Sequence, residues 1–323
     1  MVRTSSVTSP TFSADLTSLN EAAIRHDVEL AIEHGYEYTL VLAETAITVE
    51  EYGRFTAIAR ETAGDRLKLF AHTAFGTVAE NIAAMKVAER EGADLVLLSY
   101  PAQFWPTSEQ EIYDWTKEIC DATNLGVMLF PIPLWGFERI HPAGMSVEFV
   151  RKVIDTIPNV VAVKSEQGFP TIGGLTEMYH HFRDEVVISC PIEYDAIPIM
   201  SLMDLPFSGT SPTEWMSSYV PRAFDLARAG NWEEAMKLFW QVGPARVANG
   251  AAHGSYGAGT GIINRTMVKY QGWLAGYNGG PLRAPAMRVP DRIMKSLRAA
   301  LVASDLPVTD SPDSEFMVGR NPA

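Results

Sequence analysis

The sequence has very little cysteine. Only Cys120 and Cys190 occur among its 323 residues, and they are far apart in the chain. Small domains held together by disulfides have many closely spaced cysteines, so a disulfide framework is excluded. One cysteine falls in a helix-like segment and the other in a strand-like segment. We therefore expect two buried free thiols.

Positive charge and long apolar runs are also scarce. Lys and Arg number 26 against 39 Asp and Glu, for a net charge of −13, and no basic cluster is present. A nucleic-acid partner requires clustered basic residues and is not expected. No apolar run reaches the length of a membrane span, and residues 1–13 lack the apolar segment of a signal peptide. We expect a cytoplasmic protein with no membrane contact.

The sequence does contain a regular alternation of short apolar strands and amphipathic helices. Such alternation predicts a parallel sheet, and about eight strand–helix units predict a closed (β/α)8 TIM barrel. We expect residues 1–15 to be loose apart from a short strand near Val7. The remaining strands are predicted at residues 38–42, 67–71, 95–99, 127–130, 160–164, 186–190 and near Phe207.

After residue 230 the pattern becomes purely helical, with helices predicted over 232–249, 261–275 and 290–303. We therefore divide the chain into a barrel (1–230), a C-terminal helical appendage (231–304) and an extended tail (305–323). The glycine-rich stretch Gly257-Ala258-Gly259-Thr260-Gly261 follows no strand, so we interpret it as a hinge and not as a nucleotide-binding loop.

Lys164 is the residue with the clearest chemical potential. It ends the apolar strand Val160-Val161-Ala162-Val163, which we expect to be buried on both faces. In a TIM barrel, this carboxyl end of a strand is where catalytic groups lie. Burial among apolar walls lowers the pKa of a lysine, and a neutral amine can form a Schiff base with a ketone. The alternative is that the side chain extends to water.

Three segments together resemble the dihydrodipicolinate synthase / N-acetylneuraminate lyase family. The first is Lys164-Ser165-Glu166-Gln167-Gly168, similar to the family's Schiff-base lysine followed by a glycine four residues on. The second is Gly279-Gly280-Pro281-Leu282-Arg283-Ala284-Pro285, similar to its Gly-Pro-x-Arg-x-Pro turn. The third is residues 35–43, similar to the segment before its Gly-Thr-Thr-Gly loop. The resemblance extends from about Val7 to Ala303.

The resemblance implies a barrel lyase of the class I aldolase type. Lys164 would attack the keto group of pyruvate or another 2-oxo acid, and the resulting iminium would accept electrons during cleavage, condensation or dehydration. No metal and no organic cofactor are implied. Family members are often tetramers built from dimers, so we expect a homo-oligomer, either a tetramer or a dimer.

The sequence departs from the family at the residues that carry protons. Glu44 replaces the first threonine of the Gly-Thr-Thr-Gly loop, whereas Thr45 keeps the second and is predicted to hold a substrate carboxylate. Phe130 replaces the strand-end tyrosine and cannot donate a hydrogen bond. The family's synthases have a further tyrosine where this chain has Ala102 or Gln103. The arginine that often follows in the family is also missing: Trp135 lies near its position, and Arg139 is at best a displaced substitute.

We predict that Glu44 acts as a general acid or base, since carboxylates with altered pKa values cluster in active sites. The alternative is an ion pair with a lysine or arginine of the barrel. Phe130 and Trp135, with Phe104, Trp105 and Phe137 nearby, predict an aromatic-lined pocket, although packing between loops explains them equally well.

The other candidates follow predicted strands. Ser208 and Gly209, in Ser208-Gly209-Thr210-Ser211, offer amides that can bind a carboxylate, and Tyr194 is placed at the pocket mouth with Glu193. Glu166 and His72 are further strand-end candidates. His180 and His181 lack metal-ligand spacing, so no metal site is expected.

The sequence thus predicts a Schiff-base-forming aldolase or hydratase-aldolase that acts on a 2-oxo acid and a hydrophobic or aromatic aldehyde. Two alternatives remain open. One is a hydro-lyase or deaminase of a 2-oxo sugar acid or cyclic imino acid. The other is a non-catalytic relative that binds a 2-oxo acid, which the loss of the tyrosine and threonine favours and the retention of Lys164 disfavours.

Overall fold

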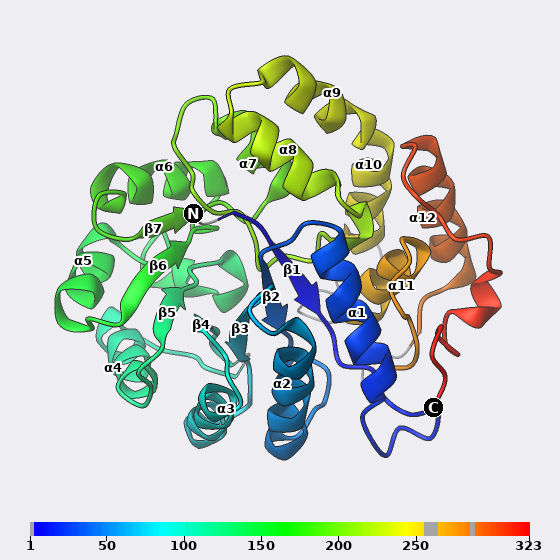
Figure 1. The fold of residues 1–323 in the computed structure, drawn as a ribbon. Helices are drawn as coiled ribbons and strands as arrows, with labels where there is room; N and C mark the ends of the chain where they lie inside the picture. Colours follow the sequence, from blue (N-terminus) through cyan, green and yellow to red (C-terminus); the bar gives the residue numbers. More distant parts are fainter. Residues whose placement is uncertain (1–2, 102, 255–263, 285–287) are drawn as a thin grey trace.

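Seven parallel strands form one curled sheet in which the strands follow each other in sequence order (Figure 1). The computed structural model describes residues 3–101, 103–254, 264–284 and 288–323. The strands form where the sequence has short apolar runs, as expected for strands covered by helices. They are β1 (Ser5–Thr8), β2 (Tyr38–Val41), β3 (Lys68–Thr73), β4 (Leu95–Leu98), β5 (Gly126–Leu129), β6 (Val160–Lys164) and β7 (Val187–Ser189).

The predicted eighth strand near Phe207 is not a regular strand. Only isolated bridges occur there, from Phe207 to Ser189 and from Ser208 to Thr4. They nevertheless link β7 to β1, and the Ser208 amide donates to the Arg3 carbonyl at 2.9 Å. Pro206, which has no N–H, precedes this segment and limits the pairing to these few contacts.

Helices surround the outside of this sheet, and their starts follow the sequence signals. Thr48 and Thr77 each form a capping box with the glutamate three residues later. Ser108 also caps its helix by accepting a hydrogen bond from the Glu111 amide, but the Glu111 carboxylate accepts from Thr107 and does not complete a box. The helices up to residue 228 are α1 (Glu21–Glu33), α2 (Val49–Ala63), α3 (Val78–Arg90), α4 (Glu109–Cys120), α5 (Val147–Thr156), α6 (Thr171–Phe182), α7 (Glu193–Ile199) and α8 (Tyr219–Arg228).

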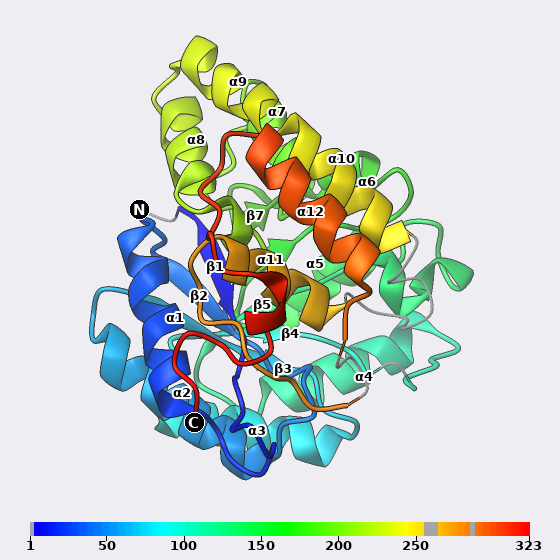
Figure 2. The same ribbon diagram turned by 90° about the vertical axis from the view of Figure 1, so that its right-hand side faces the viewer.

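Later helices form a second packing unit beside α7 and α8, and α12 lies along α10 (Figure 2). The predicted single helix over 232–249 is wrong: Gly243-Pro244 starts a new helix, because proline is favoured in a first turn and not in a helix interior. These helices are α9 (Trp232–Gln241), α10 (Gly243–Ala252), α11 (Arg265–Leu274) and α12 (Asp291–Ala303). The division of the chain at residue 230 stays a prediction.

Both chain ends pack against the fold. β1 (Ser5–Thr8) confirms the strand expected near Val7, but Thr11 and Phe12 are also fully buried, so the expectation that the rest of residues 1–15 is loose is wrong. Residues 305–323 have little regular structure, yet Phe316 is 2% exposed and Arg298 binds Asp313. Apolar burial and ion pairing therefore hold a segment whose composition is typical of disorder.

The barrel interior is filled by apolar side chains from successive strands, among them Leu40, Phe70, Leu97 and Met128. Val161 on β6 points outward and is 40% exposed, so the expectation that this strand is buried on both faces is wrong there. The filled interior leaves the carboxyl ends of the strands as the place for a site. No helix in the described ranges is long and apolar enough to span a membrane.

Some predicted features cannot be compared with the structure. The Gly257–Gly261 hinge and the start of the predicted 261–275 helix lie outside the described residues. The same holds for Ala102, one of the two positions aligned with the missing tyrosine, and for Pro285 of the C-terminal motif.

Candidate active site

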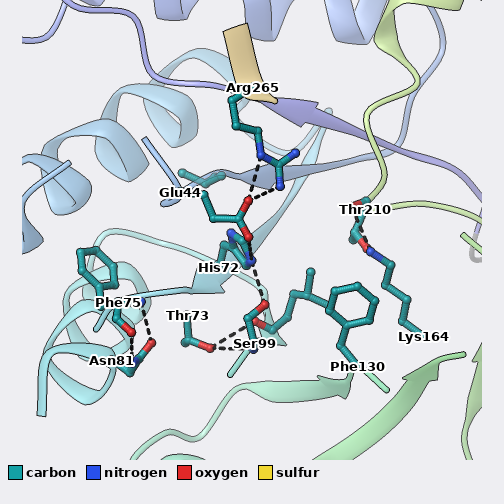
Figure 3. Close-up of polar contacts among 12 residues, drawn as sticks. Glu44, His72, Thr73, Phe75, Asn81, Ser99, Phe130, Lys164, Thr210 and Arg265 are labelled. Atoms are coloured by element: carbon teal, nitrogen blue, oxygen red, sulfur yellow. Dashed lines mark hydrogen bonds and ion pairs between the residues drawn. The ribbon is translucent and has the colours of Figure 1, made fainter. Parts of the chain in front are cut away.

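Lys164 lies at the carboxyl end of β6 with its amine inside the barrel mouth (Figure 3). The side chain is 4% exposed. Its Nζ donates a 3.3 Å hydrogen bond to the Thr210 carbonyl and lies 3.8 Å from the centroid of the Phe130 ring. Burial lowers the pKa of Lys164 to about 8, although Glu166 opposes this shift. A substantial fraction of the amine is therefore neutral near physiological pH.

Glu166 is the carboxylate nearest to this amine. Its Oε1 lies 3.7 Å from Lys164 Nζ, and its side chain is 15% exposed. Burial raises the pKa of Glu166, and the charge of Lys164 only partly offsets the effect. Both members of the pair are thus shifted toward their neutral forms, because the site is poorly solvated.

Glu44 and Arg265 form an ion pair across the barrel mouth (Figure 3). Arg265 Nε donates to Glu44 Oε2 at 2.9 Å, and a second guanidinium nitrogen contacts the same oxygen. Burial raises the pKa of Glu44, but the positive charges of Arg265 and Lys164 outweigh burial and hold it below its usual range. Glu44 is therefore ionised. Its contacts are those of the ion pair that the sequence left open as the alternative to an acid–base role.

His72, on β3, extends this polar wall. Its Nε2 lies 2.9 Å from Ser99 Oγ and 3.7 Å from Glu44 Oε1 (Figure 3). Burial lowers the pKa of His72 to about 4, so the imidazole is neutral at physiological pH and its contact with Glu44 is not an ion pair. The Nδ1 atom is buried without a partner in the described part of the chain. A proton on Nε2 suits the two oxygen atoms beside it.

These residues surround a cavity of about 80 Å³ at the barrel mouth. One wall is apolar, from Leu97, Phe130, Ile132, Leu134 and Trp135. The polar part of the lining comes from Glu44, His72 and Arg265, and Lys164 and Glu166 also line the cavity. Ser211 and Thr210 complete the lining, with Leu40 and Pro212. The cavity is small compared with drug-binding pockets of 300–1,000 Å³, which suits a substrate of a few heavy atoms.

Several predicted site residues do reach this cavity. Lys164, Glu44, Phe130 and Trp135 all line it. Trp135 donates its indole N–H to the Phe130 carbonyl at 2.7 Å, and the two rings pack edge to face. Phe130 and Trp135, which the sequence predicts to line an aromatic pocket, therefore lie on the same wall of the cavity.

Other predicted residues do not line the cavity as the described residues define it. Ser208 donates its hydroxyl to the Cys190 carbonyl at 2.9 Å. A Cβ at Gly209 would lie 2.5 Å from the Ser5 Cβ, so this glycine permits the close approach of β1. Tyr194 is 55% exposed on α7, while Thr45 is buried beside Glu44 with an unpartnered hydroxyl in the described residues. Their roles as substrate contacts stay predictions.

The remaining candidates have structural surroundings. Glu193 forms a buried ion pair with Arg246. Phe104 and Phe137 pack around Tyr100, and Arg139 stacks over the exposed Trp105. Both cysteines are buried and free. Among the described residues, no group of three or more His, Cys, Asp or Glu is arranged to hold a metal ion.

Arg265 is the main site residue that sequence reasoning missed. It belongs to the first turn of α11, 221 residues from its partner Glu44. The Asn264-Arg265-Thr266 triplet carries no signal for a site. The one usable hint is that an acidic replacement inside a barrel mouth needs a cation nearby.

Comparison with known proteins gives the family of this chain. The sequence profile of the Dihydrodipicolinate synthetase family matches residues 4–247. The chain belongs to this family. Among curated relatives, 4-hydroxy-tetrahydrodipicolinate synthase from Helicobacter pylori (strain G27) is 27% identical over 191 residues, which cover 55% of this chain and 60% of that enzyme. The match to this relative thus spans about three fifths of its length.

Solved structures support the same fold. Dihydrodipicolinate synthase from Aquifex aeolicus superposes with a TM-score of 0.76 at 19% identity, covering 96% of this chain and 100% of that chain. N-acetylneuraminate lyase from Fusobacterium nucleatum gives 0.74 at 16% identity, covering 93% and 97%. At these identities the likeness establishes the barrel fold. The curated relative is named as a synthase, and the second of these structures as a lyase.

Proposed function

We propose that this protein is a Schiff-base-forming lyase that acts on pyruvate or another 2-oxo acid. The observation that carries the proposal is the buried amine of Lys164 at the end of β6, inside a cavity and with a pKa lowered to about 8. A neutral amine in a dry site can attack a keto carbon without a metal or an organic cofactor. Membership of the family, whose curated relatives of this chain are named as synthases, supports the proposal.

The second substrate is proposed to be a hydrophobic or aromatic aldehyde, in an aldolase or hydratase-aldolase reaction. The apolar wall of Phe130, Ile132, Leu134 and Trp135 supports this choice. Leu134 is 52% exposed, so the apolar surface continues from the cavity toward solvent, where a larger partner has room. Desolvation of such a partner against this wall would favour binding.

The polar part of the lining supports the alternative reaction. Glu44, His72 and Arg265 would bind hydroxyl or carboxylate groups, as in a hydro-lyase or deaminase of a 2-oxo sugar acid or cyclic imino acid. Glu44 stays a predicted acid–base group, and its ion pair with Arg265 favours the base form. Thr45 stays a predicted carboxylate contact, since its buried hydroxyl is unpartnered in the residues described.

Borohydride trapping tests the proposal directly. The protein is incubated with pyruvate and a panel of other 2-oxo acids, reduced, and analysed by intact mass and peptide mapping. We expect one adduct, on Lys164. Lys269 is an internal control, because burial lowers its pKa too but it does not line the cavity. An absence of adducts in the folded protein would overturn the lyase proposal and favour the non-catalytic alternative.

Turnover then decides the partner. Aliphatic, aromatic and charged aldehydes are compared as co-substrates with the best-trapping 2-oxo acid. Trp135→Ala is expected to raise KM for aromatic aldehydes more than for small ones, because it removes part of the apolar wall. A cytoplasmic location and a tetrameric or dimeric assembly are further proposals carried by the family membership.

A further inference from the structure

Glu166 is placed to do chemistry that Phe130 cannot. It lies two residues beyond Lys164, and its backbone N–H donates to the Pro131 carbonyl at 3.0 Å. This bond ties the residue to the segment that carries Phe130. The carboxyl group lines the cavity, 3.7 Å from the lysine amine, and Lys164 is its only side-chain partner in the described ranges. Phe130 presents its ring to the same amine at 3.8 Å.

The other candidate groups are less suited to supplying a proton. Glu44 is held ionised by Arg265, and His72 is neutral with Nε2 beside Ser99. Burial raises the pKa of Glu166. The pKa of Glu44 is lowered on balance, because the charge of Arg265 outweighs the effect of burial. Two carboxylates whose environments separate their pKa values are suited to different roles, one staying ionised and the other carrying a proton.

We propose that Glu166 is a catalytic residue that protonates the leaving hydroxyl when Lys164 forms its imine with the 2-oxo acid. This inference rests on the proposed function and deepens it. The resembling family carries a tyrosine at the position of Phe130, whereas the donor proposed here lies two residues after the strand that carries the lysine. A Glu166 oxygen lies 3.7 Å from the reacting nitrogen, so its proton can reach the hydroxyl that leaves the neighbouring carbon.

The neutral amine of Lys164 adds to the keto carbon and forms a C–N bond, and a proton passes from nitrogen to the former carbonyl oxygen to give a carbinolamine. The nitrogen lone pair then forms C=N while the C–O bond breaks, and the Glu166 carboxyl gives its proton to the departing hydroxide. The products are an iminium, one water molecule and the Glu166 carboxylate, which faces the new positive charge.

The test is the rate of imine formation with pyruvate in single-turnover experiments, measured by quenching with borohydride at successive times. Glu166→Gln is expected to slow formation by about 100-fold or more, while the adduct at the end of the reaction still maps to Lys164. Glu166→Asp keeps a carboxyl group and is expected to recover part of the rate. Glu177→Gln, the same change at an exposed position of α6, is the matched control and is expected to react like the wild type.

The pH profile separates this role from a structural one. The wild-type rate needs a neutral Lys164 and a protonated Glu166, so it is expected to be bell-shaped, with Arg265, Glu44 and His72 as the other charged or titratable groups facing the amine. Glu166→Gln should lose the alkaline fall and keep only the rise as the lysine deprotonates. If Glu166→Gln does not fold, the alkaline fall in the pH profile of the wild-type rate still tests the proposal.

Two outcomes overturn the inference in different ways. If Glu166→Gln forms the imine at the wild-type rate across pH, or if the wild-type rate shows no alkaline fall, Glu166 is not the proton donor, and the lyase proposal is untouched. If the wild-type protein forms no adduct with any 2-oxo acid, the proposed function fails first and this inference fails with it.

Discussion

Arg265 binds Glu44 inside the barrel mouth, although the two residues are separated by 221 positions in the chain. The side chains are 9% and 18% exposed. The contact joins α11, in the C-terminal half, to the loop after β2. It supplies the cation that makes a glutamate tolerable where the family has a threonine. The cavity at the barrel mouth is therefore completed by a helix outside the strand–helix alternation of residues 1–230.

Removing one member of this pair is expected to destabilise the fold strongly. Arg265→Met leaves the Glu44 carboxylate buried without its partner, which should lower the free energy of unfolding by about 3 kcal/mol or more. Glu44→Gln together with Arg265→Met should cost much less than the sum of the single changes. Urea denaturation of the four proteins measures this coupling. Additive effects would mean that the pair does not interact energetically.

Lys164 is predicted to lower stability, as expected for a group kept for chemistry. Its pKa falls from 10.5 to about 8 on folding, so burying it costs about 3 kcal/mol at pH 7. Lys164→Met should therefore abolish trapping and raise the free energy of unfolding. The cost of burying Lys164 is fully present below pH 8 and disappears as pH rises toward 10.5. The stability gained by Lys164→Met, measured by chemical denaturation, should therefore shrink over that range. A gain independent of pH would point to packing instead.

How far sequence alone could reach depends on whether a signal is local. The strands were predictable because parallel strands covered on both faces appear as short apolar runs. Lys164 was predictable because it ends such a run. The break at Gly243-Pro244 was also readable from its residue types. The Glu44–Arg265 pair was not predictable, since no local pattern records a contact between distant segments. The burial of Phe316 was not predictable either, because the surrounding tail has a composition typical of disorder.

Acid sensitivity is expected from His72. Its pKa falls from 6.5 in the unfolded chain to about 4 in the folded protein, so the unfolded state binds more protons between these values. Stability should therefore decline as pH drops from 6.5 to 4, by about 3 kcal/mol from this residue. His72→Gln should remove that part of the slope in denaturation curves recorded across the range. An unchanged slope would show that His72 titrates normally.

Restoring a hydroxyl beside the lysine should compensate for the loss of Glu166. The ring of Phe130 lies 3.8 Å from Lys164 Nζ, so Phe130→Tyr returns a proton donor to the position at which the family carries tyrosine. In a Glu166→Gln background this change is expected to raise the rate of imine formation by about tenfold or more, because both groups serve the same proton transfer. In the wild type, where Glu166 is present, it should change little.

The control for this rescue is Phe169→Tyr in the same Glu166→Gln background. Phe169 is 94% exposed, so this change adds a hydroxyl outside the cavity. It should recover nothing. If Phe130→Tyr also recovers nothing while the variant folds and still traps pyruvate on Lys164, then position 130 and Glu166 do not share one task. A recovery confined to Phe130→Tyr would instead show that this chain carries its proton donor after β6, at Glu166, and not directly after β5, with the lysine in the same place.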